Sequence, residues 1–121
     1  MNEKTALDAL GALSQQTRMS AFRLLVASEP KGLPAGEIAR TLAVPQNTMS
    51  SHLAELAQCG LIKGQRFSRS IVYRADLAQF RALLVYLLQN CCGASPDICA
   101  PLLADIASFC PLSKRKEKRR R

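Results

Sequence analysis

The sequence has little of what membrane proteins, secreted proteins and enzymes require. No stretch of about 18 residues is free of charged and polar side chains, and the N-terminal MNEKTALDAL lacks the basic and apolar regions of a signal peptide. There is a single histidine, and no Ser/His/Asp set, paired-acid cluster or glycine-rich phosphate loop is present. We therefore expect a cytoplasmic protein that does not associate with membranes, is not an enzyme and uses no catalytic cofactor.

The five cysteines are an odd number in a chain without an export signal. Disulfide frameworks are typical of secreted proteins, whereas thiols in the cytoplasm stay reduced. Thiol chemistry or metal binding is therefore the expected use of these cysteines. The length of 121 residues suffices for one ordinary domain with a buried core.

The formal charge of +8 is concentrated at the C-terminus. Residues 114–121, KRKEKRRR, contain seven basic residues and one glutamate, so this segment carries +6 of the total and leaves about +2 for the rest. A run of like charge is usually solvated, and residues 113–121 are predicted to form a disordered basic tail. Such a tail either adds salt-dependent attraction to nucleic-acid phosphates or serves solubility alone.

The spacing of apolar residues predicts a mostly α fold with one small β-hairpin. Helices are expected over residues 6–13, from Ser14 or Thr17 to Val26, and over 37–42, 46–58, 76–92 and 99–109. The prolines and glycines of EPKGLPAG predict a loop before the third helix, and Ala43-Val44-Pro45 predicts a tight connection after it. The β-prone runs 61–67 and 71–74, joined by Ser68-Arg69-Ser70, predict a hairpin with a basic tip.

A short helix, a tight turn, a longer helix with a polar start and a following hairpin together predict a winged helix-turn-helix, whose second helix enters the major groove of DNA. Amides and hydroxyls at the start of this helix suit base edges and phosphates, and the candidates are Gln46, Asn47, Thr48, Ser50 and Ser51. Arg66 and Arg69 of the hairpin would contact phosphates or the minor groove. These residues alone also fit an ordinary solvated surface, but the order of the elements favours DNA.

The segments ALSQQTRMSAFRLLV and EIARTLAVPQNTMSSHLAELAQCGLI and the hairpin pattern R-x-x-R-S-I-V-Y-R resemble the ArsR/SmtB family of metalloregulatory repressors over residues 5–92. The most specific part is Q-x-x-x-S-x-H-L, formed by Gln46, Ser50, His52 and Leu53. The resemblance implies a homodimer, joined through its first and last helices, that occludes a promoter on double-stranded DNA until an inducer binds. His52 is assigned to the DNA face, because a lone histidine is more often a structural or phosphate-contacting group than a metal ligand.

The apolar stripes of the first and last helices suit that dimer, and the predicted interface residues are Leu7, Leu10, Leu83 and Leu87. Periodicity alone fits equally well with both stripes lying in the core of one chain. The expected organisation is a DNA-binding and dimerisation domain at residues 1–92, followed by a cysteine-bearing extension at 93–112.

Three cysteines lie within nine residues, at Cys91, Cys92 and Cys99. Adjacent helical residues point about 100° apart, but Gly93 can end the helix and a turn through Pro96 can return Cys99 toward the pair. Three thiolates without a fourth ligand suit trivalent arsenic or antimony better than tetrahedral zinc, so arsenite is the expected inducer. The pattern resembles that of arsenite-responsive ArsR repressors, although Pro34-Ala35-Gly36 stands where many of them carry a Cys-x-Cys pair.

Other readings of the cysteines stay open. The pair Cys91–Cys92 also fits a thiol redox or persulfide sensor, and Cys110 as a fourth thiolate would give a zinc or cadmium sensor. The three cysteines could also be merely small buried or incidental residues, and Cys59 is expected to be structural. A thiol-dependent arsenate reductase is improbable, since Ile98 stands where a C-x5-R anion loop beginning at Cys92 requires arginine.

Overall fold

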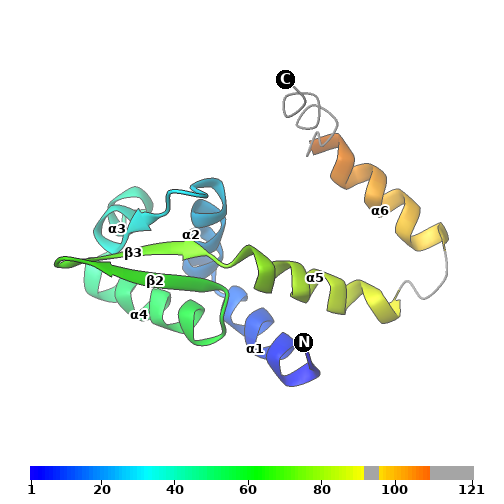
Figure 1. Ribbon diagram of the computed structural model, residues 1–121, viewed down its shortest axis with the longest axis horizontal. Helices are drawn as coiled ribbons and strands as arrows, with labels where there is room; N and C mark the ends of the chain where they lie inside the picture. The colour runs from blue at the N-terminus through cyan, green and yellow to red at the C-terminus, as the bar shows by residue number, and fades with distance from the viewer. Residues whose placement is uncertain (92–95, 110–121) are drawn as a thin grey trace. The chain divides into compact units, whose positions relative to one another are not determined.

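The computed structural model describes residues 1–91 and 96–109 (Figure 1). Its elements in chain order are α1 (Glu3–Leu13), α2 (Gln16–Ala27), β1 (Leu33–Pro34), α3 (Ala35–Leu42), α4 (Gln46–Gln58), β2 (Ile62–Phe67), β3 (Ser70–Ala75), α5 (Leu77–Cys91) and α6 (Pro96–Phe109). The chain divides into two compact units, Met1–Tyr86 and Leu87–Arg121, and each is considered by itself. None of the described helices is long and apolar enough to span a membrane.

The helix-turn-helix consists of α3 and α4, as predicted. The two helices contact each other and are joined by the short connection 43–45, where Ala43 adopts the left-handed conformation with φ 55° and ψ 47°. Pro45 precedes the first turn of α4, and Gly60, with φ 84°, follows its last. The hairpin of β2 and β3 follows at once, so the fold is a winged helix-turn-helix (Figure 1).

The sheet has three antiparallel strands in the order β1-β3-β2, one more than the predicted hairpin. The additional strand β1 lies within EPKGLPAG and pairs Leu33 with Tyr73 and Pro34 with Val72. Gly32 precedes β1 and has a φ of 77°. It lies so close to β3 that a Cβ on this residue would be 2.5 Å from the Tyr73 carbonyl oxygen. Only glycine permits this conformation and this close approach together. The loop prediction was therefore wrong for Leu33 and Pro34, and also for Ala35 and Gly36, which form the start of α3.

The core of the first unit forms where α2, α3, α4, the sheet and the start of α5 meet. Its largest fully buried side chains are Leu25, Ile38, Met49, Leu53, Leu56, Leu61, Ile62 and Leu83. The rings of Phe22 and Phe80 pack edge to face at 5.1 Å between centroids, which joins α2 to α5. This packing fixes α4 and the hairpin of β2 and β3 to one body.

Helix α1 buries mainly alanines. Asn2 caps it by accepting a hydrogen bond from the Thr5 backbone N–H at 2.8 Å. Its buried residues are Ala6, Ala9, Ala12 and Leu13, so small side chains let α1 pack closely on the unit. Leu7 and Leu10 are exposed.

The second unit contains the end of α5 and α6. The latter begins at Pro96, three residues before the predicted start at Cys99. Proline suits a first helical position because its missing N–H would have no helical partner there. Exposed apolar side chains of α6 include Leu103, Ile106 and Phe109.

Candidate nucleic-acid interface

The recognition helix α4 has one buried side and one polar side. Met49, Leu53 and Leu56 are completely buried, as their spacing predicts. All five predicted reading residues of its first half are exposed: Gln46, Asn47, Thr48, Ser50 and Ser51. The exposed half carries amides and hydroxyls but no charge, which is a surface suited to hydrogen bonding with base edges.

Local hydrogen bonds organise the start of α4. Pro45 occupies the N-cap position without a side-chain cap, and the Thr48 backbone N–H donates to Asn47 Oδ1 at 2.9 Å. The Ser51 hydroxyl donates to the Asn47 carbonyl oxygen at a long 3.5 Å. An uncapped first turn directs backbone N–H groups and the positive end of the helix dipole outward, toward any anion that approaches.

His52 is half-buried on α4. Its Nδ1 lies 3.3 Å from Nη1 of Arg18, which belongs to α2. Sequence reasoning assigned His52 to the DNA face but did not identify Arg18, because the two residues are 34 positions apart.

The wing exposes both predicted arginines. Arg66 pairs with Ile71 across the hairpin, Phe67 pairs with Ser70, and Ser68 turns the chain with φ 56°. Arg66 and Arg69 are exposed, and Phe67 between them is 52% exposed. Phe67 was not predicted as a surface residue, although strict alternation along the strand places it on the opposite face from Arg66.

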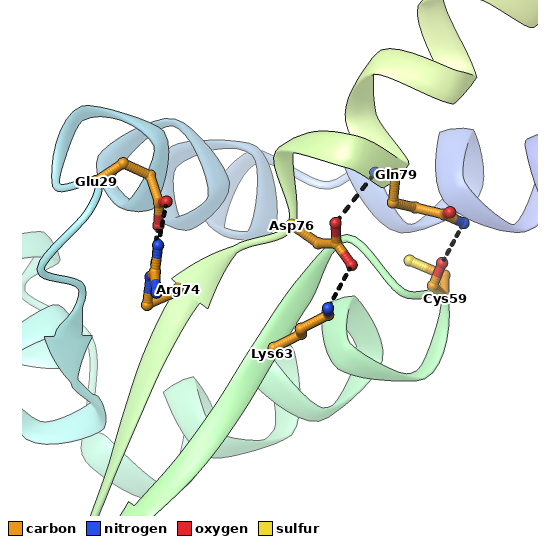
Figure 2. Close-up of polar contacts among 6 residues, drawn as sticks. All are labelled: Glu29, Cys59, Lys63, Arg74, Asp76 and Gln79. Atoms are coloured by element: carbon orange, nitrogen blue, oxygen red, sulfur yellow. Dashed lines mark hydrogen bonds and ion pairs between the residues drawn. The ribbon is translucent and has the colours of Figure 1, made fainter.

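Polar contacts hold the base of the wing to its neighbours (Figure 2). Arg74 of β3 forms two contacts with the Glu29 carboxylate, at 2.9 and 3.2 Å, and this hydrogen bonding raises the pKa of the arginine. Lys63 of β2 lies 3.4 Å from Asp76, which also accepts from the Gln79 backbone N–H at 3.1 Å and so caps α5. The wing is thereby joined to the α2–β1 connection and to the start of α5.

The end of the recognition helix is joined to α5 in the same region. The Gln79 side-chain amide donates to the Cys59 carbonyl oxygen at 3.5 Å (Figure 2). The Cys59 thiol is half-buried and donates to the Leu56 carbonyl at 3.3 Å. Burial is the largest effect and raises the pKa of this thiol; backbone hydrogen bonds oppose it, and the negative charges of Asp8 and Glu55 add a smaller increase.

The four predicted interface leucines separate into two groups. Leu7 is 60% exposed, Leu10 37% and Leu87 36%, so each offers an apolar surface. Leu83 is only 2% exposed and belongs to the core of its own chain, which corrects its assignment to a dimer interface. The stripe on α5 has a buried side because its first turns pack on α2, as the Phe22–Phe80 contact shows.

The predicted cysteine site falls largely outside what the structure describes. Cys92 and Cys110 lie outside the described residues, and of Cys91 and Cys99 only the backbone, in α5 and α6, is described. Among the residues searched, those with described placement, no group of three or more His, Cys, Asp and Glu side chains could hold a metal ion. The metal-site prediction thus stays a prediction.

Comparison with known proteins agrees with the geometry. A helix-turn-helix domain family matches residues 13–65. The transcriptional activator HlyU of Vibrio cholerae is 26% identical over 94 residues, which cover 78% of this chain and 84% of HlyU. Both likenesses include the recognition helix.

Solved structures extend the likeness to the fold. An ArsR-like transcriptional regulator from Rhodococcus sp. RHA1 is 27% identical, with a TM-score of 0.63 over 88% of this chain and 93% of its own. The homodimeric winged helix-turn-helix DNA-binding domain of Mb0332 from Mycobacterium bovis, at 22% identity, shares the fold with a TM-score of 0.57 over 71% of this chain and 80% of its own. The chain is therefore a DNA-binding transcriptional regulator similar to proteins of the ArsR and HlyU type, and it is not an enzyme, which removes the arsenate reductase reading.

Proposed function

We propose that this protein is a transcriptional regulator of the ArsR/HlyU type: a cytoplasmic, homodimeric repressor of an arsenic-resistance operon that leaves its operator when trivalent arsenic binds. The observation that carries the DNA-binding part is the uncharged, exposed first half of α4 beside a wing with two exposed arginines. The inducer is assigned from the cysteine pattern and from the resemblance to ArsR repressors.

In the proposed complex, α4 enters the major groove and the wing follows the backbone. Gln46 and Asn47 have amides that pair with adenine edges, and the hydroxyls of Thr48, Ser50 and Ser51 bond bases or phosphates. Arg66 and Arg69 supply positive charge. Sequence specificity therefore comes from α4 and electrostatic attraction from the wing. A salt titration separates these two contributions, because only the contacts with phosphates depend strongly on salt.

Fluorescence anisotropy on promoter DNA across a salt series tests this division. Arg66→Ala and Arg69→Ala should each reduce the slope of log affinity against log salt by about 1, because each removes one phosphate contact. Gln46→Ala should weaken binding to the operator without changing that slope. Equal slopes for wild type and both arginine variants would remove the wing from the interface.

The exposed apolar residues of α1 and α5 support the homodimer. Besides Leu7 and Leu10, the α5 residues Leu84 and Val85 of the same unit are 43% and 51% exposed. Apolar side chains exposed in such numbers on two helices are typical of an interaction surface. Mb0332 is described as homodimeric, and the same arrangement is proposed for this chain.

The proposed inducer site consists of Cys91, Cys92 and Cys99, with arsenite as the main ligand and antimonite as a second. Binding would order residues 91–99, shift the final helix and move the two recognition helices away from the spacing of the operator half-sites. A difference of about 10³-fold in arsenite affinity between the free and DNA-bound states corresponds to about 4 kcal/mol of coupling, enough to empty an operator.

The test follows anisotropy of the reduced protein on DNA from its own promoter at fixed salt, with arsenite, zinc and peroxide added separately. We expect release by arsenite alone. Cys91→Ser should keep DNA binding and lose release, whereas the matched control Cys59→Ser should keep both. Release of Cys91→Ser by arsenite would overturn the site assignment.

A thiol-oxidation sensor is the second candidate, because the neighbouring thiols of Cys91 and Cys92 can also be oxidised or persulfidated. Release by peroxide or polysulfide without arsenite would favour it. Release by zinc, with a tetrahedral cobalt spectrum that depends on Cys110, would instead favour the zinc or cadmium sensor.

A further inference from the structure

Arg18 occupies an unusual place at the junction of three helices. It lies in the first turn of α2, where its backbone N–H donates to Gln15 Oε1 at 2.8 Å. Its side-chain Nε donates to the Ala12 carbonyl oxygen at 2.7 Å. Ala12 is in the last turn of α1, where carbonyl groups lack helical partners, so this contact satisfies a free acceptor and fixes the guanidinium.

The other edge of the guanidinium faces the recognition helix. Nη1 of Arg18 lies 3.3 Å from Nδ1 of His52. An arginine side chain has only donors and stays protonated, so it cannot accept a hydrogen from the ring. Nδ1 must therefore be the acceptor, and the proton of the neutral imidazole sits on Nε2. With the proton on Nδ1 instead, the Nδ1–H of His52 would face the Nη1–H of Arg18, and no hydrogen bond could form.

We propose that Arg18 is a positioning residue that holds His52 in its Nε2–H tautomer, so that α4 presents a ring N–H donor to a phosphate or base acceptor of the operator. This role rests on the proposed function, since it needs α4 to face DNA. If Arg18 served only to connect α1 with α2, its bond to the Ala12 carbonyl would be sufficient. The second edge of its guanidinium, however, contacts the His52 side chain on α4. One arginine thus connects α1 to the donor set of the recognition helix.

The tautomer is measured without DNA. His52 is the only histidine of the chain, so long-range ¹⁵N–¹H correlation of the ring gives one set of signals that needs no assignment. We expect the Nε2–H pattern in the wild type and a shift toward a mixture of tautomers in Arg18→Met, which removes all the donors of the side chain. A wild-type ring with its proton on Nδ1 overturns the proposal, even if Arg18→Met fails to fold.

DNA affinity tests what the tautomer is for. His52→Gln places an amide near the position of Nε2, and His52→Asn places one near Nδ1. By anisotropy on promoter DNA, His52→Gln should stay close to the wild type, while His52→Asn and Arg18→Met should each weaken binding about tenfold, the effect of one hydrogen bond to a charged group.

The two arms separate the two proposals. If the wild type binds promoter DNA and has the Nε2–H tautomer but all three variants bind equally well, the donor role is overturned while the proposed function stands. If the wild type does not bind promoter DNA, the proposed function fails and the donor role with it, whereas the tautomer assignment is decided by the ring spectrum alone.

Discussion

Substitution of Leu83 by alanine distinguishes a core residue from an interface residue. Leu83 is 2% exposed, so the change removes three carbons that are already shielded by their own chain. At about 0.8 kcal/mol per carbon the transfer cost is about 2.4 kcal/mol, and the residual cavity raises the loss of unfolding free energy to about 3–4 kcal/mol. For a domain of this size the melting temperature should fall by about 10 °C or more.

The assay is urea unfolding at two protein concentrations, combined with sedimentation to measure the dimer. Leu7→Ala is the matched control, because Leu7 is 60% exposed and its truncation should change the stability of the single chain by no more than about 0.5 kcal/mol. We expect Leu83→Ala to lose stability by a similar amount at both concentrations, and Leu7→Ala to weaken the proposed dimer. A Leu83→Ala variant of wild-type stability that dissociates more readily would refute the core assignment.

Three further predictions use local conformation and burial. Ala43→Gly should raise the free energy of urea unfolding by about 0.5 kcal/mol, since relief of the left-handed conformation exceeds the added freedom of the unfolded chain, and a decrease would contradict this. Gly32→Ala should lower the same free energy by more than about 1 kcal/mol, because the new Cβ would lie 2.5 Å from the Tyr73 carbonyl and separate β1 from β3. Burial raises the pKa of Cys59, so at neutral pH less of it is thiolate; its alkylation, followed by peptide mass mapping, should be slower in the native than in the denatured protein and accelerate only at higher pH than an ordinary thiol. Equal rates would show that the thiol is accessible and unperturbed.

The recognition helix and wing could be predicted because their signals are local. Met49, Leu53 and Leu56 repeat at helical spacing, Pro45 and Gly60 mark the ends, and the β-prone runs are separated by a short polar turn. These features depend on neighbours in sequence, so the predicted range 46–58 for α4 agrees with the structure. The exposed reading residues follow directly from that periodicity.

Other features depended on contacts that sequence spacing does not contain. On α1, Leu7 and Leu10 are more hydrophobic than alanine and yet are exposed, while three alanines and Leu13 face the core, because the helix packs closely against its unit. The strand β1 requires Gly32 to approach Tyr73, and the Arg18–His52 contact spans 34 residues. The burial pattern of α1, the strand β1 and the Arg18–His52 contact all depend on residues that are close in space but distant in sequence. Hydrophobic periods of 2 or 3.6 residues contain no information about such contacts.

The way α4 is held limits how an inducer can act. Its underside is fully buried, so the helix cannot swing on its own without opening a close-packed core. Its polar contacts with α2 and α5 are long for hydrogen bonds, at 3.3 Å from His52 to Arg18 and 3.5 Å from Cys59 to Gln79. The buried apolar side of α4 therefore holds the helix more strongly than these contacts do. Release from DNA is therefore expected through rotation of whole protomers, which changes the distance between the two recognition helices and leaves each helix in place within its own unit.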